Sequence, residues 1–134
     1  YCSICRKCQG GGGYAINLGG DARTLHVTGE DHLRRYHAVL RDHDDETRSN
    51  AERAFCGECG SALWLFDPNW PELIHPFASA IDTPLPTPPA NVHLMLDAKP
   101  DWVAVEGRRG DDRFPEYPAL SLAEWHKRHG DDGG

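Results

Sequence analysis

Short stretches in which apolar and polar residues alternate recur along the chain, separated by glycine and proline. Such alternation is typical of strands with one buried face. It predicts strands over residues 14–18, 25–28, 33–40 and 92–96. Strands are also expected over 73–81, before a proline-rich loop, and over 102–105, after a Lys-Pro turn. A short helix is the alternative for residues 33–40. Ala-Leu-Trp-Leu-Phe at 62–66 is a continuous apolar run, which predicts a strand buried on both faces.

One segment near the C-terminus has a helical pattern. Ser121-Leu122-Ala123-Glu124 is a capping box, in which serine and glutamate satisfy each other's backbone N–H groups at a helix start. The helix that it opens places four residues on one face: Leu122, Trp125, His126 and His129. Many short strands with one terminal helix predict a mainly β fold.

The length and charge limit the domain count and the partners. At 134 residues, the chain is expected to form a single domain over residues 1–129, followed by a disordered tail at 130–134. No run of eighteen apolar residues is present, so no membrane span is predicted. A net charge of −7 argues against nucleic acid or an anionic membrane as the main partner.

The five cysteines fall into two short groups with two-residue spacing. Their number is odd and their spacing is that of metal ligands or reactive thiols, not of a disulfide framework. Such thiols are typical of a reducing compartment, so we expect a cytoplasmic protein.

The stretch Cys56-Gly57-Glu58-Cys59-Gly60 has the spacing of a metal-binding knuckle. We expect Gly57 and Gly60 to let the backbone turn, so that its N–H groups can point at the thiolates, because glycine tolerates positive φ. Cys56 and Cys59 supply two of the four ligands of a tetrahedral site. Zinc is favoured over iron because nothing else in the chain indicates redox chemistry.

The N-terminal group carries the more reactive chemistry. Cys2 and Cys5 are candidate metal ligands, and Cys8 is a further candidate whose alternative is an idle thiol. The cationic side chains of Arg6 and Lys7 favour thiolates at neutral pH. Three thiolates around one zinc leave a fourth position open to substrate, which is the layout of a catalytic zinc.

The histidines are weaker candidates. His75 and His93 lie in predicted strands, where they could line a pocket or act as acid and base. Hydrogen-bonded structural histidines are the commoner case in such positions.

Three motifs together resemble the glutathione-dependent formaldehyde-activating enzyme family, which includes centromere protein V. They are Cys-Ser-Ile-Cys-Arg-Lys at 2–7, Cys-Gly-Glu-Cys-Gly-Ser-Ala-Leu at 56–63, and Phe-Pro-Glu-Tyr-Pro at 114–118. The resemblance implies a β-tent, built of several short antiparallel sheets around zinc. It also implies a structural zinc that joins an early Cys-x-Cys pair to Cys56 and Cys59, and a catalytic zinc with Cys2 and Cys5 as the last two members of a Cys-x-Cys-x-x-Cys motif.

The chain departs from that family pattern at its start. The early Cys-x-Cys pair and the first cysteine of the second motif are absent. We expect that the sequence lacks an N-terminal segment. The alternative is that Cys2, Cys5, Cys56 and Cys59 form one site.

The resemblance implies a zinc-dependent carbon–sulfur lyase that acts on an adduct of glutathione, or a similar thiol, with an aldehyde, such as S-hydroxymethylglutathione. Cys2 and Cys5 would be the catalytic zinc ligands, and Arg6 or Lys7 would hold a glutathione carboxylate. The alternative is a non-catalytic, zinc-stabilised binding scaffold with a degenerate second metal site. A weaker reading is a thiol-sensing module built on Cys5 and Cys8.

Overall fold

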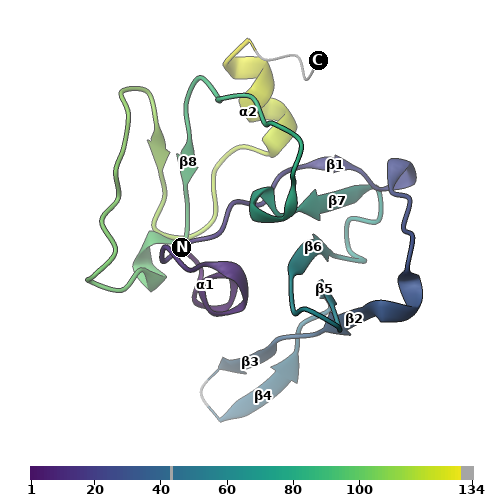
Figure 1. Cartoon of the computed structure of the whole chain (residues 1–134). Coiled ribbons are helices and arrows are strands. Elements are labelled where there is room, and N and C mark those ends of the chain that lie inside the picture. Colours follow the sequence, from purple (N-terminus) through teal and green to yellow (C-terminus); the bar gives the residue numbers. More distant parts are fainter. Residues whose placement is uncertain (43, 131–134) are drawn as a thin grey trace. The chain divides into compact units, whose positions relative to one another are not determined.

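The computed structural model describes residues 1–42 and 44–130 (Figure 1). The predicted tail beyond residue 130 therefore lies outside the described residues. The chain divides into two compact units, one of Ile16–Leu85 and the other of Tyr1–Ala15 with Pro86–Gly134. The single domain over residues 1–129 stays a prediction.

The Ile16–Leu85 unit is built on a five-stranded antiparallel sheet. Its strand order is β1 (Gly20–Asp21), β7 (Leu73–Pro76), β6 (Ala62–Phe66), β5 (Glu52–Cys56) and β2 (Leu33–Tyr36). The register between β5 and β6 shifts at Ala54 and Phe55, as in a β-bulge. The sheet and its connections bury an apolar core that includes Leu33, Ala38, Ala54, Ile74 and Phe77.

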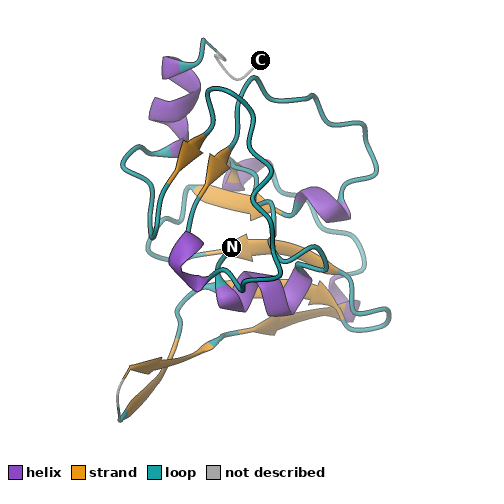
Figure 2. Cartoon of the chain, turned by 90° about the vertical axis from the view of Figure 1, so that its left-hand side faces the viewer, coloured by secondary structure: helices purple, strands orange, loops and turns teal. Residues whose placement is uncertain are grey.

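A separate hairpin follows β2 in the chain. Strands β3 (Val39–Asp42) and β4 (Asp45–Arg48) pair antiparallel, with Val39 opposite Arg48, and the hairpin extends away from the five-stranded sheet (Figure 2). Every residue of β4 is exposed. Short 3₁₀ turns complete the unit: η1 (Ala22–Thr24), η2 (Glu30–His32) and η3 (Ala78–Ala80).

The second unit contains both α-helices. Helix α1 (Ser3–Gln9) begins just after the start of the chain, and α2 (Leu122–Arg128) lies near its end. Strands β8 (Val92–His93) and β9 (Asp112–Arg113) form a parallel pair, and η4 (Leu96–Ala98) follows β8. The buried apolar residues are Ala90, Val103 and Trp125.

The capping box at the start of α2 is confirmed. The Ser121 hydroxyl accepts from the Glu124 backbone N–H, and the Glu124 carboxylate accepts from the Ser121 N–H. Trp125 is buried and stacks on His129, with ring centroids 4.1 Å apart. Leu122, however, is 44% exposed, so the predicted apolar face is buried mainly through Trp125.

A mainly β fold with several antiparallel sheets and a short C-terminal helix is confirmed. The predicted strands over 33–40 and 62–66 are present, the first of them divided between β2 and β3. Every residue of β6 is half-buried, so the predicted burial of both faces was wrong. The prediction for 73–81 was too long, because β7 ends at Pro76, Phe77 forms only a bridge to Asn17, and the chain then turns into η3. The prediction for 92–96 was also too long, since β8 ends at His93.

Three predicted strands are absent. Residues 14–18 form only one bridge, between Asn17 and Phe77, and residues 25–28 and 102–105 form no strand. Leu25 is 38% exposed and Trp102 is 67% exposed, whereas Val103 is buried without forming a strand. Apolar residues alone do not make a strand when no neighbouring strand offers hydrogen bonds.

Candidate metal centre

The predicted knuckle forms the tight turn between β5 and β6. The Cys56 N–H donates to the carbonyl of Ser61 at 2.9 Å, and the Gly60 N–H donates to the carbonyl of Cys56 at 2.8 Å. Gly60 has φ +76°, so the positive φ expected at this turn is confirmed at that position.

Gly57 has a different role from the one expected. Its N–H donates to the carbonyl of His32 at 2.7 Å, not to a thiolate, and its φ is not positive. A Cβ at this position would lie 3.0 Å from that carbonyl oxygen and 3.0 Å from Arg34 Cγ. A side chain here would therefore crowd η2 and β2, which no local pattern indicates.

Cys59 is exposed and Cys56 is half-buried. The Sγ atom of Cys59 lies 3.1 Å from Ser61 Oγ. Hydrogen bonds from the Ser61 side chain and backbone, and then from the Cys56 side chain, hold the pKa of the Cys59 thiol below its usual value. A lowered pKa favours the thiolate, which is the form that binds metal. Sequence reasoning did not single out Ser61.

Ionisable side chains flank the knuckle. His32 Nδ1 lies 3.2 Å from Glu58 Oε1, and His32 Nε2 lies 3.6 Å from Asp31 Oδ2. All three side chains are more than half exposed, which makes these contacts weak surface pairs.

Cys5 and Cys8 lie on helix α1, which no sequence pattern predicted, and Cys2 immediately precedes it. Cys2 is the N-cap residue, and its carbonyl accepts from the Arg6 N–H at 2.9 Å. Cys2 and Cys5 are half-buried, whereas Cys8 is exposed. Cys2 precedes the helix with a non-helical ψ of 136°, and Cys5 lies in the first turn.

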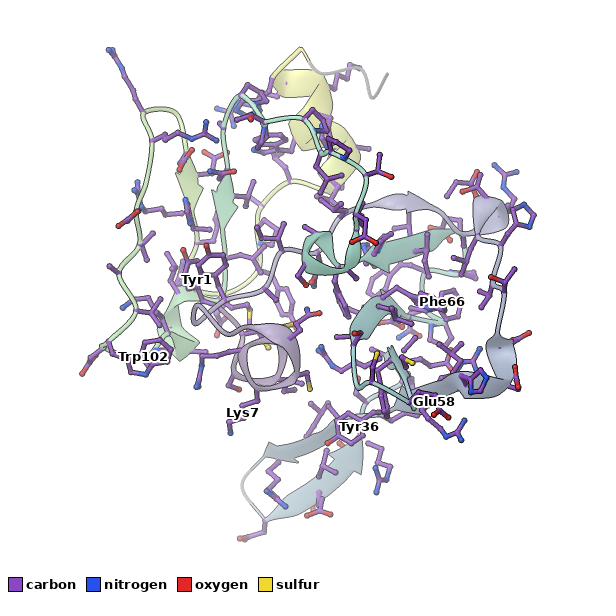
Figure 3. The ribbon with its side chains drawn as sticks, in the orientation of Figure 1. Tyr1, Lys7, Tyr36, Glu58, Phe66 and Trp102 are labelled. Carbon is purple, nitrogen blue, oxygen red and sulfur yellow. The ribbon has the colours of Figure 1, made fainter. Side chains whose placement is uncertain are left out.

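Arg6 and Lys7 lie in the last turn of α1, where positive charge stabilises a helix. Lys7 is exposed and projects from the helix (Figure 3). Arg6 is half-buried, and its Nε is buried with no hydrogen-bond partner among the residues that the structure describes. The two cations therefore have different surroundings.

The two cysteine groups belong to different units. Within the described ranges, no three histidine, cysteine, aspartate or glutamate side chains come together in a group that could hold a metal. The donor set of each group nonetheless fits zinc, because each turn presents a Cys-x-x-Cys pair and the Cys59 pKa is lowered. Cys2, Cys5, Cys8, Cys56 and Cys59 remain predicted ligands.

The unit that contains α1 also holds a hydrogen-bonded chain of three side chains. The Tyr1 hydroxyl lies 2.9 Å from His93 Nδ1, and His93 Nε2 lies 2.9 Å from Asp111 Oδ2. The Asp111 carboxylate also accepts from the backbone N–H groups of Asn91 at 2.8 Å and Arg108 at 2.9 Å. We call Tyr1, His93 and Asp111 the Tyr-His-Asp chain.

The surroundings of the Tyr-His-Asp chain change the pKa of the two side chains at its ends, Tyr1 and Asp111. The Arg108 N–H, the His93 ring and the Asn91 N–H hold the pKa of Asp111 far below its usual range. Burial, followed by the neighbouring Tyr14, raises the pKa of the Tyr1 hydroxyl. Asp111 is therefore a fixed anionic acceptor.

Sequence reasoning found one member of this chain. His93 is an acid–base candidate from the sequence, whereas Tyr1 and Asp111 were not singled out. His93 and Asp111 lie 92 and 110 positions after Tyr1, so no local pattern connects the three residues. His75, the other candidate, pairs with the Leu18 carbonyl at 3.0 Å, which is the expected structural role.

Together, the fold and these groups define a mainly β protein with paired cysteines suited to bind metal. A family model described as glutathione-dependent formaldehyde-activating enzyme matches residues 1–95, a segment that holds all five cysteines. A curated protein of Halomonas elongata, provisionally named a glutathione-dependent formaldehyde-activating enzyme, is 60% identical over the whole chain, which covers 83% of that protein. No solved structure gave a significant match. The chain belongs to the glutathione-dependent formaldehyde-activating enzyme family.

Proposed function

We propose that the protein is a zinc-dependent carbon–sulfur lyase whose substrate is the adduct of glutathione, or a similar thiol, with an aldehyde such as formaldehyde. The observation that carries the proposal is the family match over residues 1–95, which includes both Cys-x-x-Cys pairs. The paired thiols belong in a reducing compartment, and we place the reaction in the cytoplasm.

The reaction is an addition and its reverse. In the synthetic direction, a carbon–sulfur bond forms between the thiol and the carbonyl carbon, and the thiol proton ends on the former carbonyl oxygen. Neither partner is oxidised or reduced, so no redox cofactor is needed. Cleavage of the adduct reverses each of these changes.

Cys2 and Cys5 are the proposed ligands at the reacting site, with Cys8 as a further candidate. Zinc, when bound, would supply a positive charge that stabilises thiolate and developing oxyanion. Cys2 immediately precedes α1 and Cys5 lies in its first turn, so both residues belong to the same end of the helix. Cys56 and Cys59 are the proposed structural ligands, and the β-tent would be organised around them.

Arg6 is a better candidate than Lys7 for a glutathione carboxylate. It lies four residues after Cys2, which places the two residues on the same side of the helix. Lys7 follows Cys5 by two residues and therefore lies on the opposite side. A guanidinium also binds a carboxylate through two parallel hydrogen bonds, which an ammonium group cannot do.

The test is exchange between ¹³C-formaldehyde and its glutathione adduct, measured by NMR in the purified protein. The uncatalysed addition is facile, so the rate without protein is subtracted. We expect Cys5→Ser to lower the catalysed exchange rate by more than about 100-fold, since a ligand of the reacting centre is lost. Arg6→Ala should raise the KM for glutathione by about 10-fold, as expected for loss of a charged hydrogen-bonding partner.

The outcomes separate the alternatives. Exchange no faster than the background, with zinc bound and the fold intact after Cys2→Ser and Cys5→Ser, would favour the binding scaffold. Reversible oxidation of Cys5 and Cys8 without loss of zinc would favour the thiol-sensing module. Cys8→Ser distinguishes a ligand from an idle thiol, because only loss of a ligand lowers the rate.

A further inference from the structure

The Tyr-His-Asp chain places polar side chains in the interior of the protein. Of the residues that the structure describes, His93 is the one polar residue classed with the buried core, at 9% exposure. The side chain of Asp111 is 0% exposed. Buried polar groups cost free energy unless their hydrogen bonds are satisfied, and these bonds are satisfied only while the three side chains remain together.

The hydrogen bonds of this chain have a defined direction. An ionised Asp111 carboxylate can only accept, so His93 Nε2–H is the donor in that contact. In a neutral imidazole, Nδ1 is then the acceptor, and the Tyr1 hydroxyl donates to it. Asp111 therefore selects the His93 tautomer, and that tautomer holds Tyr1.

Tyr1 is held at several points. Its backbone nitrogen donates to the Leu94 carbonyl at 3.1 Å, and its ring lies 5.8 Å from the His93 ring and 5.4 Å from the Tyr14 ring. The residue that follows is Cys2. The orientation of Tyr1 therefore constrains the backbone from which Cys2 projects.

Helix α1 depends on such external contacts. It has seven residues, fewer than an isolated helix needs, and Cys2 makes no side-chain cap hydrogen bond. Beyond its far end, Gly13 has φ +95° and packs so closely on Val103 that a Cβ would overlap that side chain. Anchors before and after the helix thus determine where its thiols point.

We propose that His93, oriented by Asp111, is a positioning residue that acts through Tyr1 to orient the Cys2 and Cys5 thiols at the reacting centre. This inference rests on the proposed function. Asp111 lies beyond the segment matched by the family model, at residues 1–95, so the anchor joins the matched segment to the remainder of the chain.

The test replaces the partners of one hydrogen bond. Tyr1→Phe removes the hydroxyl and keeps the ring. His93→Gln removes the imidazole acceptor for Tyr1 while offering an amide N–H to Asp111. Tyr14→Phe is the matched control, because Tyr14 contacts the Tyr1 ring but its hydroxyl is not part of the Tyr-His-Asp chain.

The first measurement uses the full chain loaded with cobalt(II), since zinc has a filled d shell and no d–d spectrum. Cys2→Ser identifies the absorption bands that depend on the N-terminal thiols. We expect those bands to shift in Tyr1→Phe and in His93→Gln. The double variant should show no larger shift than either single variant, because each of the three proteins lacks the hydrogen bond between Tyr1 and His93. Tyr14→Phe should retain the unmutated spectrum.

The second measurement is steady-state exchange of the zinc-loaded protein. A thiol misplaced by a fraction of an ångström affects the reacting geometry, so we expect kcat to fall about 10-fold in both single variants. KM for glutathione should change by less than about 2-fold, because the carboxylate contact is unaffected. A role in folding alone would lower the yield of folded protein and leave kcat per folded molecule unchanged.

The two measurements separate this inference from the proposed function. Unchanged cobalt bands in Tyr1→Phe and His93→Gln, with an active unmutated protein, would overturn the positioning role alone. Shifted bands in an inactive protein would uphold the positioning of the thiols and overturn the lyase activity. Bands that do not depend on Cys2 would overturn both, since no metal would then be held by the N-terminal thiols.

Discussion

At the scale of single residues, Asp111 shows how the structure supports a charge inside the protein. Two backbone N–H groups and the His93 ring donate to one carboxylate. These donors stabilise the ionised form, which explains the lowered pKa despite burial of the side chain. The consequence is a contribution to stability that depends on pH.

We predict that Asp111→Asn lowers the urea midpoint at pH 7 and removes part of its acid dependence. Because the pKa is lowered on folding, the ionised Asp111 stabilises the protein above about pH 4, the usual pKa of the side chain, and this stabilisation is lost as the pH falls further. His93 is the titratable side chain that contacts Asp111 directly. The difference between the variant and the unmutated protein should therefore shrink below about pH 4.

Asp101→Asn is the matched control for this prediction. Asp101 is exposed and contributes one carboxylate of the same kind. Its replacement should leave the urea midpoint unchanged both at pH 7 and below about pH 4. An Asp111→Asn midpoint equal to that of the unmutated protein at pH 7 would contradict the prediction.

At the scale of elements, the two α-helices differ in what defines them. The start of α2 is encoded locally, by a capping box within four residues. Helix α1 has no such signal, since Cys2 provides no side-chain cap and the first turn has no acidic residue. Local sequence reasoning accordingly found α2 and missed α1.

We predict that Ser121→Ala lowers the free energy of unfolding of α2 by about 1 kcal/mol, the usual cost of losing a serine cap. Amide hydrogen exchange in residues 124–129 measures this loss, and the exchange rates should rise by about 5-fold. Ser121→Thr retains a hydroxyl and should recover most of the protection. Equal exchange rates in Ser121→Ala and the unmutated protein would show that packing of Trp125, not the cap, holds the helix.

The strands also show that local sequence does not decide every element. The continuous apolar run at 62–66 is β6, which lies between β5 and β7 and is hydrogen-bonded on both edges. The stretch Trp-Val-Ala-Val at 102–105 is also apolar throughout, yet it forms no strand. Position between two partners, and not propensity, separates the two cases.

At the scale of the whole molecule, the five cysteines are divided between two units. The number of zinc ions per chain is therefore an informative quantity. One zinc per chain would indicate a single four-cysteine site. Two would require ligands beyond the five cysteines, because two tetrahedral sites need eight positions filled.

We predict that Cys56→Ser removes about one zinc per chain and lowers Tm by more than about 10 °C, because structural zinc contributes several kcal/mol to folding. Elemental mass spectrometry and thermal unfolding measure the two effects. A chelator should lower the Tm of the unmutated protein in the same way and leave that of Cys56→Ser unchanged. Cys8→Ser tests whether the exposed Cys8 is also a ligand.

A Cys56→Ser protein with the zinc content and Tm of the unmutated protein would contradict this assignment. Ser61→Ala provides a milder variant, since it removes the hydroxyl beside Cys59 and leaves both thiols in place. We expect weaker zinc binding in that variant, by about 10-fold, as for other groups that orient a metal ligand.

The sequence by itself determined the features that depend on near neighbours. These are the two Cys-x-x-Cys pairs, the Cys56–Gly60 turn, β6, the capping box of α2 and, through its motifs, the family. Each is specified within a few consecutive residues, so the information is complete before the chain folds. The mainly β class follows from the recurrence of such segments.

Tertiary structure decided the features that join distant residues. It made α1 a helix, left residues 25–28 and 102–105 without strand partners, and packed Gly57 closely against β2. It also brought Tyr1, His93 and Asp111 into one hydrogen-bonded chain. The physical reason is that burial and hydrogen-bond partners are properties of the packed chain, and their cost or gain is not contained in any local pattern.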